Sequence, residues 1–337
     1  MIVGMNTPFG GLTPDRILGA VEEHSGVFLD GSLTTYNSYI NRVFGVKDDD
    51  EKRYIVKFYR PGRWSAEAIR DEHEFLADCR KAEIPVVPPI AGKNGNTAGT
   101  LTVPAEEGMD ATEIRYAVFP FRPGRTFDII TDDDWVRTGR AIGRMHRAAR
   151  ARKATSRIRC NPEETTARYI RNLTENGLIH PDCLEDFIRV TGDALDRIAP
   201  LFASLGESAF QRIHGDCHRG NILEGAEREI TIIDFDDMMM GPATQDLWLL
   251  LPGHLSESMR EMNLILEGYE QFAEFNRATL ELVEPLRFMR HIYFLNWCAI
   301  QRDDAGFAAR FPGWGSRAFW IQETEDLTAQ LAFLEPR

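Results

Sequence analysis

The chain has 337 residues, of which 43% are hydrophobic and 27% charged, and its formal net charge is −13. This length and composition predict a folded protein of one large domain or two lobes, and they exclude intrinsic disorder. The acidic balance argues against a general nucleic-acid binder, because contacts to phosphates need clustered Lys and Arg.

The first 118 residues are predicted to form a sheet and one principal helix. Thr13 before Pro14 marks the capped start of a short helix, and Ser65 is the predicted N-cap of the principal helix. Aromatic and β-branched residues that alternate with polar ones predict strands, and a stretch rich in Gly and Asn at 92–99 predicts a loop. The predicted strands lie at 36–46, 53–59, 100–104 and 115–119, and the principal helix at 65–82.

A hinge is predicted at 119–124, where two prolines and a glycine follow the last of these strands. Beyond the hinge the apolar residues recur almost throughout at helical spacing. The exception is a strand-like passage at 229–235, which follows the densest polar loop of the chain. Helices are predicted at 133–150, 162–176, 181–205, 256–275, 280–300 and 318–334.

The dense polar loop reads His-Gly-Asp-Cys-His-Arg-Gly-Asn at 214–221, and Asp234 lies thirteen residues after Asn221. Phosphoryl transfer from ATP needs a group that orients the attacking hydroxyl, and oxygen ligands that hold Mg²⁺ against the phosphates. Asp216 suits the first task, and Asn221 and Asp234 suit the second. The motif therefore predicts a magnesium-dependent phosphotransferase.

Strand alternation beyond residue 229 predicts that Asp234 and Asp236 point to one side and Asp237 to the other, so that two carboxylates reach one metal. Two other interpretations of the loop remain open. The acids and histidines can be ordinary solvated loop residues, or His214, Cys217 and His218 can be zinc ligands.

Lys57 and Glu72 form a second candidate pair. Lys57 shares one face of its predicted strand with Ile55 and Tyr59, and Glu72 falls within the apolar stripe of the principal helix. An inward carboxylate without a partner is costly, so we expect Glu72 to pair with Lys57 and to position it for the phosphates of ATP. The alternative is an exposed Lys on an edge strand and an exposed Glu.

These motifs resemble the aminoglycoside phosphotransferase and choline kinase group of the protein-kinase-like superfamily. Over nearly its full length the chain is similar to the bacterial stress response kinase A family of cytoplasmic serine/threonine protein kinases. The similar segments are 36–43, 56–61, 214–223 and 241–248. The resemblance implies an α+β, two-lobed protein-kinase-like fold with an antiparallel-sheet N-lobe and a mainly helical C-lobe.

The expected domains are an N-lobe at 1–118, a hinge at 119–124 and a C-lobe at 125–337, with a catalytic loop at 213–223 and a metal-binding strand at 229–237. The resemblance implies that Asp216 is the proton acceptor. It further implies catalytic and Mg²⁺-binding roles for Asp234, Mg²⁺ binding by Asn221, ATP binding by Asn37, Lys57 and Glu72, and supporting roles for His214, His218, Asp236 and Asp246.

Two departures from ordinary protein kinases affect the expected function. No G-x-G-x-x-G loop precedes Lys57, and only seven residues separate Asp234 from Pro242, too few for an activation loop. We expect transfer of the γ-phosphate of ATP to a serine or threonine of a protein. The alternatives are a small-molecule kinase for an amino alcohol, sugar or aminoglycoside, and a catalytically silent nucleotide-binding scaffold.

The five cysteines form no C-x-x-C pair, which argues against a disulfide framework and a structural zinc site and fits a reducing compartment. No run of about 18 apolar residues occurs, and the segment 1–11 does not resemble a secretory leader. We expect a cytoplasmic monomer that binds neither nucleic acid nor membrane.

Overall fold

The structure is a computed structural model that describes residues 8–104 and 111–334. The chain divides into two compact units, residues 1–125 with 223–233, and residues 126–222 with 234–337. Among the described residues, no helix combines the length and the apolar character that a membrane span requires. The sequence predicts that segment 1–11 is not a secretory leader. Residues 1–7 of this segment lie outside the described residues, and the expectation stays a prediction.

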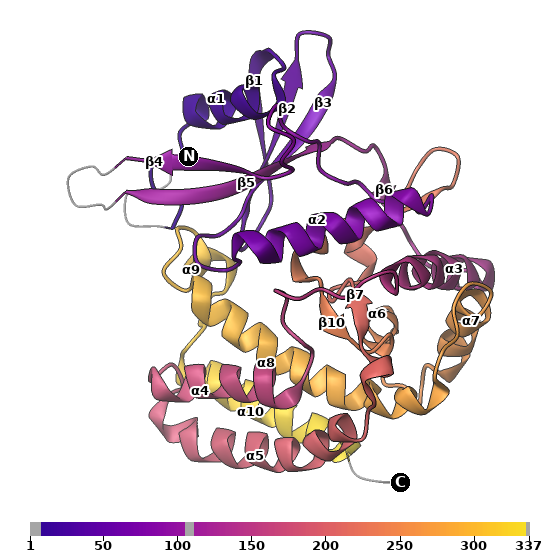
Figure 1. The fold of residues 1–337 in the computed structure, drawn as a ribbon. Coiled ribbons are helices and arrows are strands. Elements are labelled where there is room, and N and C mark those ends of the chain that lie inside the picture. The colour runs from indigo at the N-terminus through magenta and orange to yellow at the C-terminus, as the bar shows by residue number, and fades with distance from the viewer. Residues whose placement is uncertain (1–7, 105–110, 335–337) are drawn as a thin grey trace. The chain divides into compact units, whose positions relative to one another are not determined.

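The first unit is built on a five-stranded antiparallel sheet with the strand order β1-β2-β3-β5-β4 (Figure 1). Its strands are β1 (Leu29–Tyr36), β2 (Arg42–Asp48), β3 (Arg53–Phe58), β4 (Gly99–Val103) and β5 (Thr112–Pro120). Central strand β3 pairs with β2 and β5, and Lys57 lies opposite Val43 on one side and Ala117 on the other.

Two helices cover the faces of this sheet. The alternation of β3 places Tyr54, Val56 and Phe58 in one core, which they share with residues of α1 (Pro14–Ser25). On the other face, Tyr59 packs with Ile69 of α2 (Ala66–Lys81). Strand β3 is therefore buried on both faces of the sheet, which leaves Lys57 an interior position.

The two predicted N-caps of this unit are confirmed. The Thr13 hydroxyl accepts a hydrogen bond from the Arg16 N–H before α1, and Pro14 is the first helical residue. The Ser65 hydroxyl accepts from the Ala68 N–H at the start of α2, at 3.1 Å. Each cap satisfies an N–H group that has no partner within its own helix.

The predicted strand at 36–46 is wrong in its boundaries. The chain forms β1 before it, ending at Tyr36, turns at 37–41, and begins β2 at Arg42. Strand β1 was missed because it is largely exposed and reads Leu-Asp-Gly-Ser-Leu-Thr-Thr-Tyr, which lacks strong alternation. The other three strands occur close to their predicted positions.

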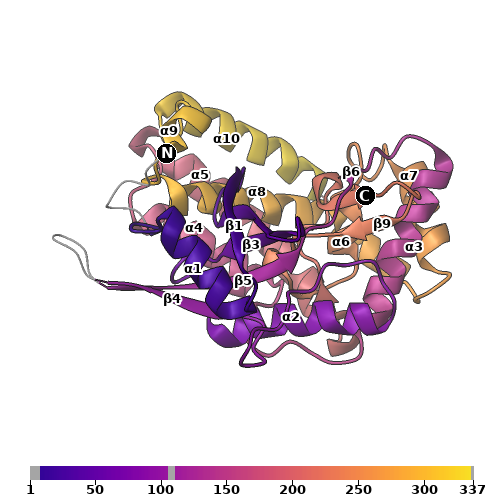
Figure 2. The same ribbon diagram turned by 90° about the horizontal axis from the view of Figure 1, so that it is seen from above.

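The second unit is mainly helical (Figure 1). Its helices of nine residues or more are α3 (Asp132–Ala149), α4 (Ala167–Glu175), α5 (Pro181–Ala203), α7 (Met259–Tyr269), α8 (Val283–Gln301) and α10 (Arg317–Leu331). Helix α10 packs along α5 and α8, and α7 packs along α3 (Figure 2).

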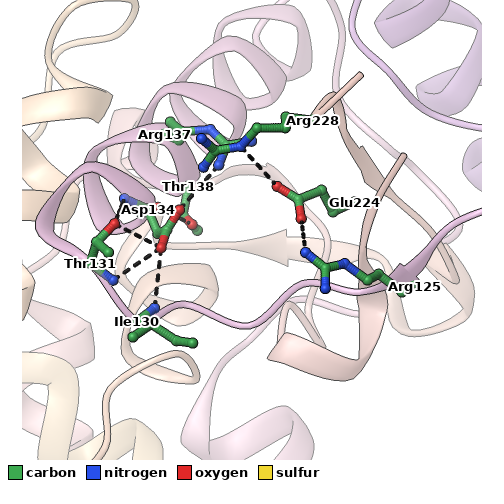
Figure 3. A network of polar contacts seen from close by, with 8 residues as sticks. All are labelled: Arg125, Ile130, Thr131, Asp134, Arg137, Thr138, Glu224 and Arg228. Carbon is green, nitrogen blue, oxygen red and sulfur yellow. Dashed lines mark hydrogen bonds and ion pairs between the residues drawn. The ribbon is translucent and has the colours of Figure 1, made fainter. Parts of the chain in front are cut away.

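Helices α3 and α7 approach each other through glycines. A Cβ atom on Gly139 of α3 would meet the Ile265 carbonyl, and one on Gly268 of α7 would meet the Val136 carbonyl. The start of α3 is fixed by a capping box, in which Thr131 and Asp134 each bind the other's main-chain N–H (Figure 3). The close packing on α7 and the N-terminal capping box together fix the position of the C-terminal end of α3.

Two predicted helices differ from the structure. The segment 162–176 begins with a π-turn, Pro162–Thr166, before α4, and the predicted helix at 256–275 is shorter, spanning only α7. The π-turn is not visible in the apolar pattern, because that pattern reports burial and not the hydrogen-bond step. Residues 270–275 are apolar enough to continue the pattern, but the chain leaves the helix after Tyr269.

Short strands precede and follow the polar loop along the chain. Strands β7 (Gln211–Ile213) and β10 (Met239–Gly241) pair with each other in the second unit. A separate sheet has the order β6-β8-β9, formed by β6 (Arg125–Thr126), β8 (Ile222–Glu224) and β9 (Ile230–Ile232). Buried Glu224 pairs with Arg125 at 2.8 Å and with Arg228 at 3.6 Å (Figure 3).

Candidate active site

The polar loop at 214–221 is held at its start by Asp246. This residue lies in the short helix α6 (Thr244–Trp248) and is fully buried. Its Oδ2 accepts from the His214 N–H at 2.7 Å, and its Oδ1 accepts from the Gly215 N–H at 2.8 Å. Hydrogen bonds that main-chain amides donate to a buried carboxylate fix the path of the backbone.

A third partner reaches Asp246 from α3. His146 Nε2 lies 2.9 Å from Asp246 Oδ2, and His146 Nδ1 lies 3.0 Å from the hydroxyl of Tyr269 on α7. A neutral imidazole that donates from Nε2 and accepts at Nδ1 satisfies both contacts. The glycine-mediated packing of α3 on α7 therefore places the imidazole that supports Asp246.

Gly215 is required by the backbone at this point. Its φ is +84°, and a Cβ atom there would meet the Asp237 carbonyl. Its own carbonyl accepts from Gln245 Nε2 at 3.0 Å, and Gln245 Oε1 accepts from Trp248 Nε1 at 3.0 Å. The turn before Asp216 is thus bound on both sides by α6.

Asp216 lies next in the loop, with its side chain 18% exposed. Its Oδ1 is 2.7 Å from Nη2 of Arg290 on α8, and its Oδ2 is 3.7 Å from Nε2 of His218. Burial lowers the pKa of His218, and the Asp216 carboxylate opposes that shift. Arg290 therefore supplies the nearest positive charge and fixes one oxygen of the carboxylate.

Asn221 ends the short turn that follows Asp216 and is 9% exposed. Its Nδ2 donates to the main-chain carbonyl of Asp216 at 2.9 Å. Because a carbonyl can only accept, this bond assigns the amide nitrogen and leaves Oδ1 as the atom that can bind a hard cation. The predicted base and the predicted amide ligand are therefore connected within one loop.

Asp234 does not lie on a strand, so the expected alternation of Asp234, Asp236 and Asp237 is wrong. Strand β9 ends at Ile232, Asp234 has a φ of +60°, and a 3₁₀ turn follows at Phe235–Asp237. The left-handed conformation, unusual for a non-glycine residue, ends the strand and redirects the chain. The centre of the Phe235 ring lies 4.6 Å from the centre of the His214 ring, so this turn lies beside the polar loop.

The other two acids of the turn contact side chains that the sequence did not indicate. The buried Arg157 donates to the main-chain carbonyl of Asp236 at 2.6 Å. The Tyr293 hydroxyl on α8 donates to Asp237 Oδ1 at 2.9 Å. Arg290 and Tyr293 thus bind two different acids from one face of α8.

Lys57 and Glu72 pair as predicted within the first unit, with Lys57 Nζ 2.8 Å from Glu72 Oε1. They are 7% and 1% exposed, so the alternative of an exposed Lys on an edge strand is wrong. The Tyr59 hydroxyl also contacts Glu72 Oε1, at 3.3 Å, and the Lys57 ammonium lies 4.5 Å from the centre of the Tyr59 ring. Asn37 lies directly after β1 and is exposed.

The side chains of the polar loop and of the turn at Asp234 determine which metal ion they can bind. Within residues 8–104 and 111–334, no three His, Cys, Asp or Glu side chains converge on a position that would hold a metal ion. The zinc alternative for His214, Cys217 and His218 therefore has no support. Mg²⁺ needs only one or two protein oxygens together with water and phosphate, which fits an amide and a carboxylate such as those of Asn221 and Asp234.

Sequence reasoning missed Arg290, Tyr293, Arg157 and His146. Arg290 is 74 residues from its partner Asp216, and His146 is 100 residues from Asp246. Arg290 and Tyr293 lie on α8, whose sequence has the pattern of an ordinary amphipathic helix, and Arg157 lies in a loop with several arginines. No motif in the chain marks which of these side chains turn toward the loop.

Comparison with known proteins gives one family and several relatives. A model of the phosphotransferase enzyme family matches residues 32–283. The serine/threonine protein kinase RdoA of Salmonella typhimurium (strain LT2) is 36% identical over 332 residues, 97% of this chain and 94% of the relative. Stress response kinase A of Escherichia coli (strain K12) is 36% identical over 330 residues, 97% of this chain and 95% of the relative.

Solved structures of similar fold cover almost the whole chain. An amicoumacin kinase, hAmiN, in complex with AMP-PNP, Ca²⁺ and Ami, has a TM-score of 0.71 at 19% identity, covering 94% of this chain and 93% of that one. A microcompartment-associated aminopropanol kinase has a TM-score of 0.66 at 19% identity, covering 95% of each chain. The predicted α+β protein-kinase-like fold, with an antiparallel-sheet N-lobe and a mainly helical C-lobe, is confirmed.

Proposed function

The chain belongs to the phosphotransferase enzyme family, and within it to the group of the stress response kinase A proteins; from this premise we propose that it transfers the γ-phosphate of ATP to a serine or threonine hydroxyl of a protein. Kinase activity follows from the family. The use of ATP, the metal and the protein acceptor are the proposed parts.

Asp216 is the proposed proton acceptor. As the acceptor oxygen bonds to the γ-phosphorus, the bond between this phosphorus and the β-γ bridging oxygen breaks, ADP leaves, and the hydroxyl proton passes to the carboxylate. The observation that carries this role is the ion pair of Asp216 Oδ1 with Arg290 at 2.7 Å. It fixes the carboxylate and leaves Oδ2 beside His218 as the oxygen that can face a hydroxyl.

Asn221 and Asp234 are the proposed ligands of Mg²⁺. The bond from Asn221 Nδ2 to the Asp216 carbonyl supports this role, because it uses the amide nitrogen and leaves the amide oxygen as the atom that can bind a cation. When bound, the metal would neutralise charge on the phosphates. The contacts of Asp246 with His214 and Gly215 would keep this loop in one conformation while substrates exchange.

Lys57 is proposed to bind the phosphates of ATP, with Glu72 holding its ammonium group in place. The support is its burial on a central strand and its 2.8 Å ion pair, an arrangement that protein kinases use for the same purpose. Asn37, exposed after β1, is proposed to contribute to the same nucleotide site. The domain boundaries at 119–124, the cytoplasmic location and the monomeric state also remain proposals.

A small alcohol is the second candidate acceptor. Two structural relatives are named as kinases of amicoumacin and aminopropanol, and the chain between Asp234 and Pro242 is as short as the sequence indicates, with only a 3₁₀ turn and β10. The protein acceptor is favoured because the relatives that share 36% of their residues with this chain include one named as a serine/threonine protein kinase.

The test is transfer from γ-labelled ATP to a bacterial protein lysate and, separately, to its metabolite extract, with the labelled products identified by mass spectrometry. We expect labelled phosphoserine or phosphothreonine from the lysate. Asp216→Asn should lower the rate about 10²- to 10⁴-fold and leave ATP affinity within about tenfold. Asp196→Asn, an exposed change on α5, is the matched control.

Label only in the metabolite extract would assign the small-alcohol function. Equal rates for Asp216→Asn and the unchanged protein would remove Asp216 from the reaction. No transfer to either pool, together with ATP binding, would point to the silent scaffold.

A further inference from the structure

A small pocket lies beside Asp216 in the helical unit. Gly215, directly before Asp216, and Arg290, its ion-pair partner, are among the twelve residues that line it. The pocket has a volume of ≈ 40 Å³, which is room for about three water molecules at ~10–15 Å³ each. A group of a few heavy atoms fits this space, and a sugar ring does not.

Thr166 is a buried polar residue among those that line this pocket. It ends the π-turn Pro162–Thr166, lines the pocket, and is 1% exposed. Within the described chain its hydroxyl has no hydrogen-bond partner. A buried hydroxyl without a partner costs free energy and is expected where a ligand or an ordered water completes the bond.

Other buried helical threonines do not share this property. Thr138, Thr191 and Thr324 each donate to the carbonyl four residues earlier, at 2.7 Å. Neighbouring Thr165 does the same with the Asn161 carbonyl. In the π-turn the Pro162 carbonyl instead accepts the Ala167 N–H, five residues on, and the Thr166 hydroxyl makes no bond to this carbonyl.

The charges around the pocket disfavour a cationic ligand. Among the described residues that line it, Arg290 is the one charged group and none is a carboxylate. Tyr169 and Tyr293 also line it, and their rings already carry guanidinium groups, Arg168 at 5.4 Å and Arg290 at 4.7 Å from the ring centres. The nearby Asp216 and Asp237 bind Arg290 and the Tyr293 hydroxyl. An ammonium group would lose its hydration here without gaining a negatively charged partner among the lining residues.

We propose that this pocket receives the side chain of the acceptor serine or threonine, that the Thr166 hydroxyl hydrogen-bonds that side chain, and that acceptors with an ammonium group beside the hydroxyl are rejected. The inference rests on the proposed phosphotransferase function and names the class of acceptor. It assigns to Thr166 a binding role and leaves the proton transfer with Asp216.

Thr166→Val tests the hydrogen bond, because valine has nearly the same shape and no hydroxyl. With labelled ATP and a serine peptide that has alanine and glutamine on both sides, we expect kcat/KM for the peptide to fall about tenfold, with KM for ATP unchanged. Thr166→Ser should restore most of the loss. The melting temperature of Thr166→Val should equal or exceed that of the unchanged protein, since no internal bond is removed.

Thr191→Val is the matched control, because its hydroxyl is bonded to the Phe187 carbonyl far along α5. It should lower the melting temperature and leave kcat/KM for the peptide unchanged. The charge preference is tested by lysine in place of the flanking glutamines and by 1-amino-2-propanol. We expect kcat/KM at least tenfold lower for the lysine peptide and no measurable transfer to the amino alcohol.

The results separate this inference from the proposed function. If Asp216→Asn abolishes transfer but Thr166→Val leaves kcat/KM for the peptide unchanged, the inference is wrong and the proposed function stands. Preference for the lysine peptide or for 1-amino-2-propanol also overturns it. No transfer from ATP to any of these acceptors by the unchanged protein contradicts the proposed function, and the inference fails with it.

Discussion

Glu72 and Asp246 are carboxylates that the fold buries almost completely, one in each compact unit, and they differ in what they bind. The contacts of Glu72 include two side-chain groups, the Lys57 ammonium and the Tyr59 hydroxyl. Asp246 binds two main-chain N–H groups and one imidazole. The first carboxylate holds a charge in position, and the second holds a stretch of backbone.

This difference determines which substitutions of Glu72 and of Asp246 the fold can tolerate. A side-chain partner can be removed together with the carboxylate, and apolar groups of similar size can fill the space at little net cost in stability. Main-chain amides cannot be removed, so nothing but another acceptor can replace Asp246. Substitutions at the two sites should therefore behave in opposite ways when their partners are changed as well.

The largest effect is expected for Asp246→Ala. Two buried N–H groups and the His146 imidazole lose their acceptor, which should lower the free energy of unfolding by about 3 to 5 kcal/mol. Urea unfolding followed by circular dichroism measures the change. Adding His146→Leu should not restore stability, because the amides of His214 and Gly215 remain unpaired. Recovery in the double variant would show that the imidazole, and not the backbone, is the main partner.

Lys57→Met comes next, with an expected loss of about 3 kcal/mol, because Glu72 is left buried without its cation. The double variant Lys57→Met/Glu72→Leu should recover to within about 1 kcal/mol of the unchanged protein by urea unfolding. Its phosphotransferase activity should stay low, with a raised KM for ATP or a lower kcat. Normal activity in either variant would make Lys57 an ordinary strand residue.

Arg290→Met examines an intermediate case, a side-chain pair whose arginine is 28% exposed. Stability should change by less than about 1 kcal/mol, while kcat should fall about 10- to 100-fold because Asp216 loses its orientation. KM for ATP should stay within threefold. Steady-state kinetics measures both, with Arg260→Met, whose exposed side chain pairs with Asp132, as the control. A fall in stability without a change in kcat would make the pair purely structural.

Glu284 combines both kinds of partner. Burial alone would raise the pKa of Glu284, but bonds from Gln330, the Leu255 N–H and His254 and the charge of Arg287 outweigh it, so the pKa is lowered. Its stabilising effect is present above the ordinary glutamate pKa of about 4.3, and it is lost as the pH falls through the lower folded-state value.

Glu284→Gln should therefore cost about 1 to 2 kcal/mol at pH 7, and the difference from the unchanged protein should shrink as the pH is lowered below about 4. Urea unfolding measured at several pH values tests this. A difference that is constant across the range would mean that the ionised form of Glu284 adds no stability.

The sequence by itself determined the features that depend on neighbouring residues. Ser65 caps its helix because the cap needs only the three residues that follow it. Lys57 and Glu72 pair because strand alternation and helical spacing place each on a buried face, and only 15 residues separate them. The fold class also followed from local patterns together with the resemblance to a known family.

Only the tertiary structure decided how the polar loop is held. Asp246 meets His214 across 32 residues, and Arg290 meets Asp216 across 74. Which arginine of α8 turns toward the loop depends on how that helix is rotated and packed, and neither periodicity nor composition records this. Likewise, the left-handed turn at Asp234 and the π-turn at Thr166 come from hydrogen bonds whose partners are chosen by the packing around them. Local sequence patterns predict which residues are buried, and packing over long separations decides which of them meet.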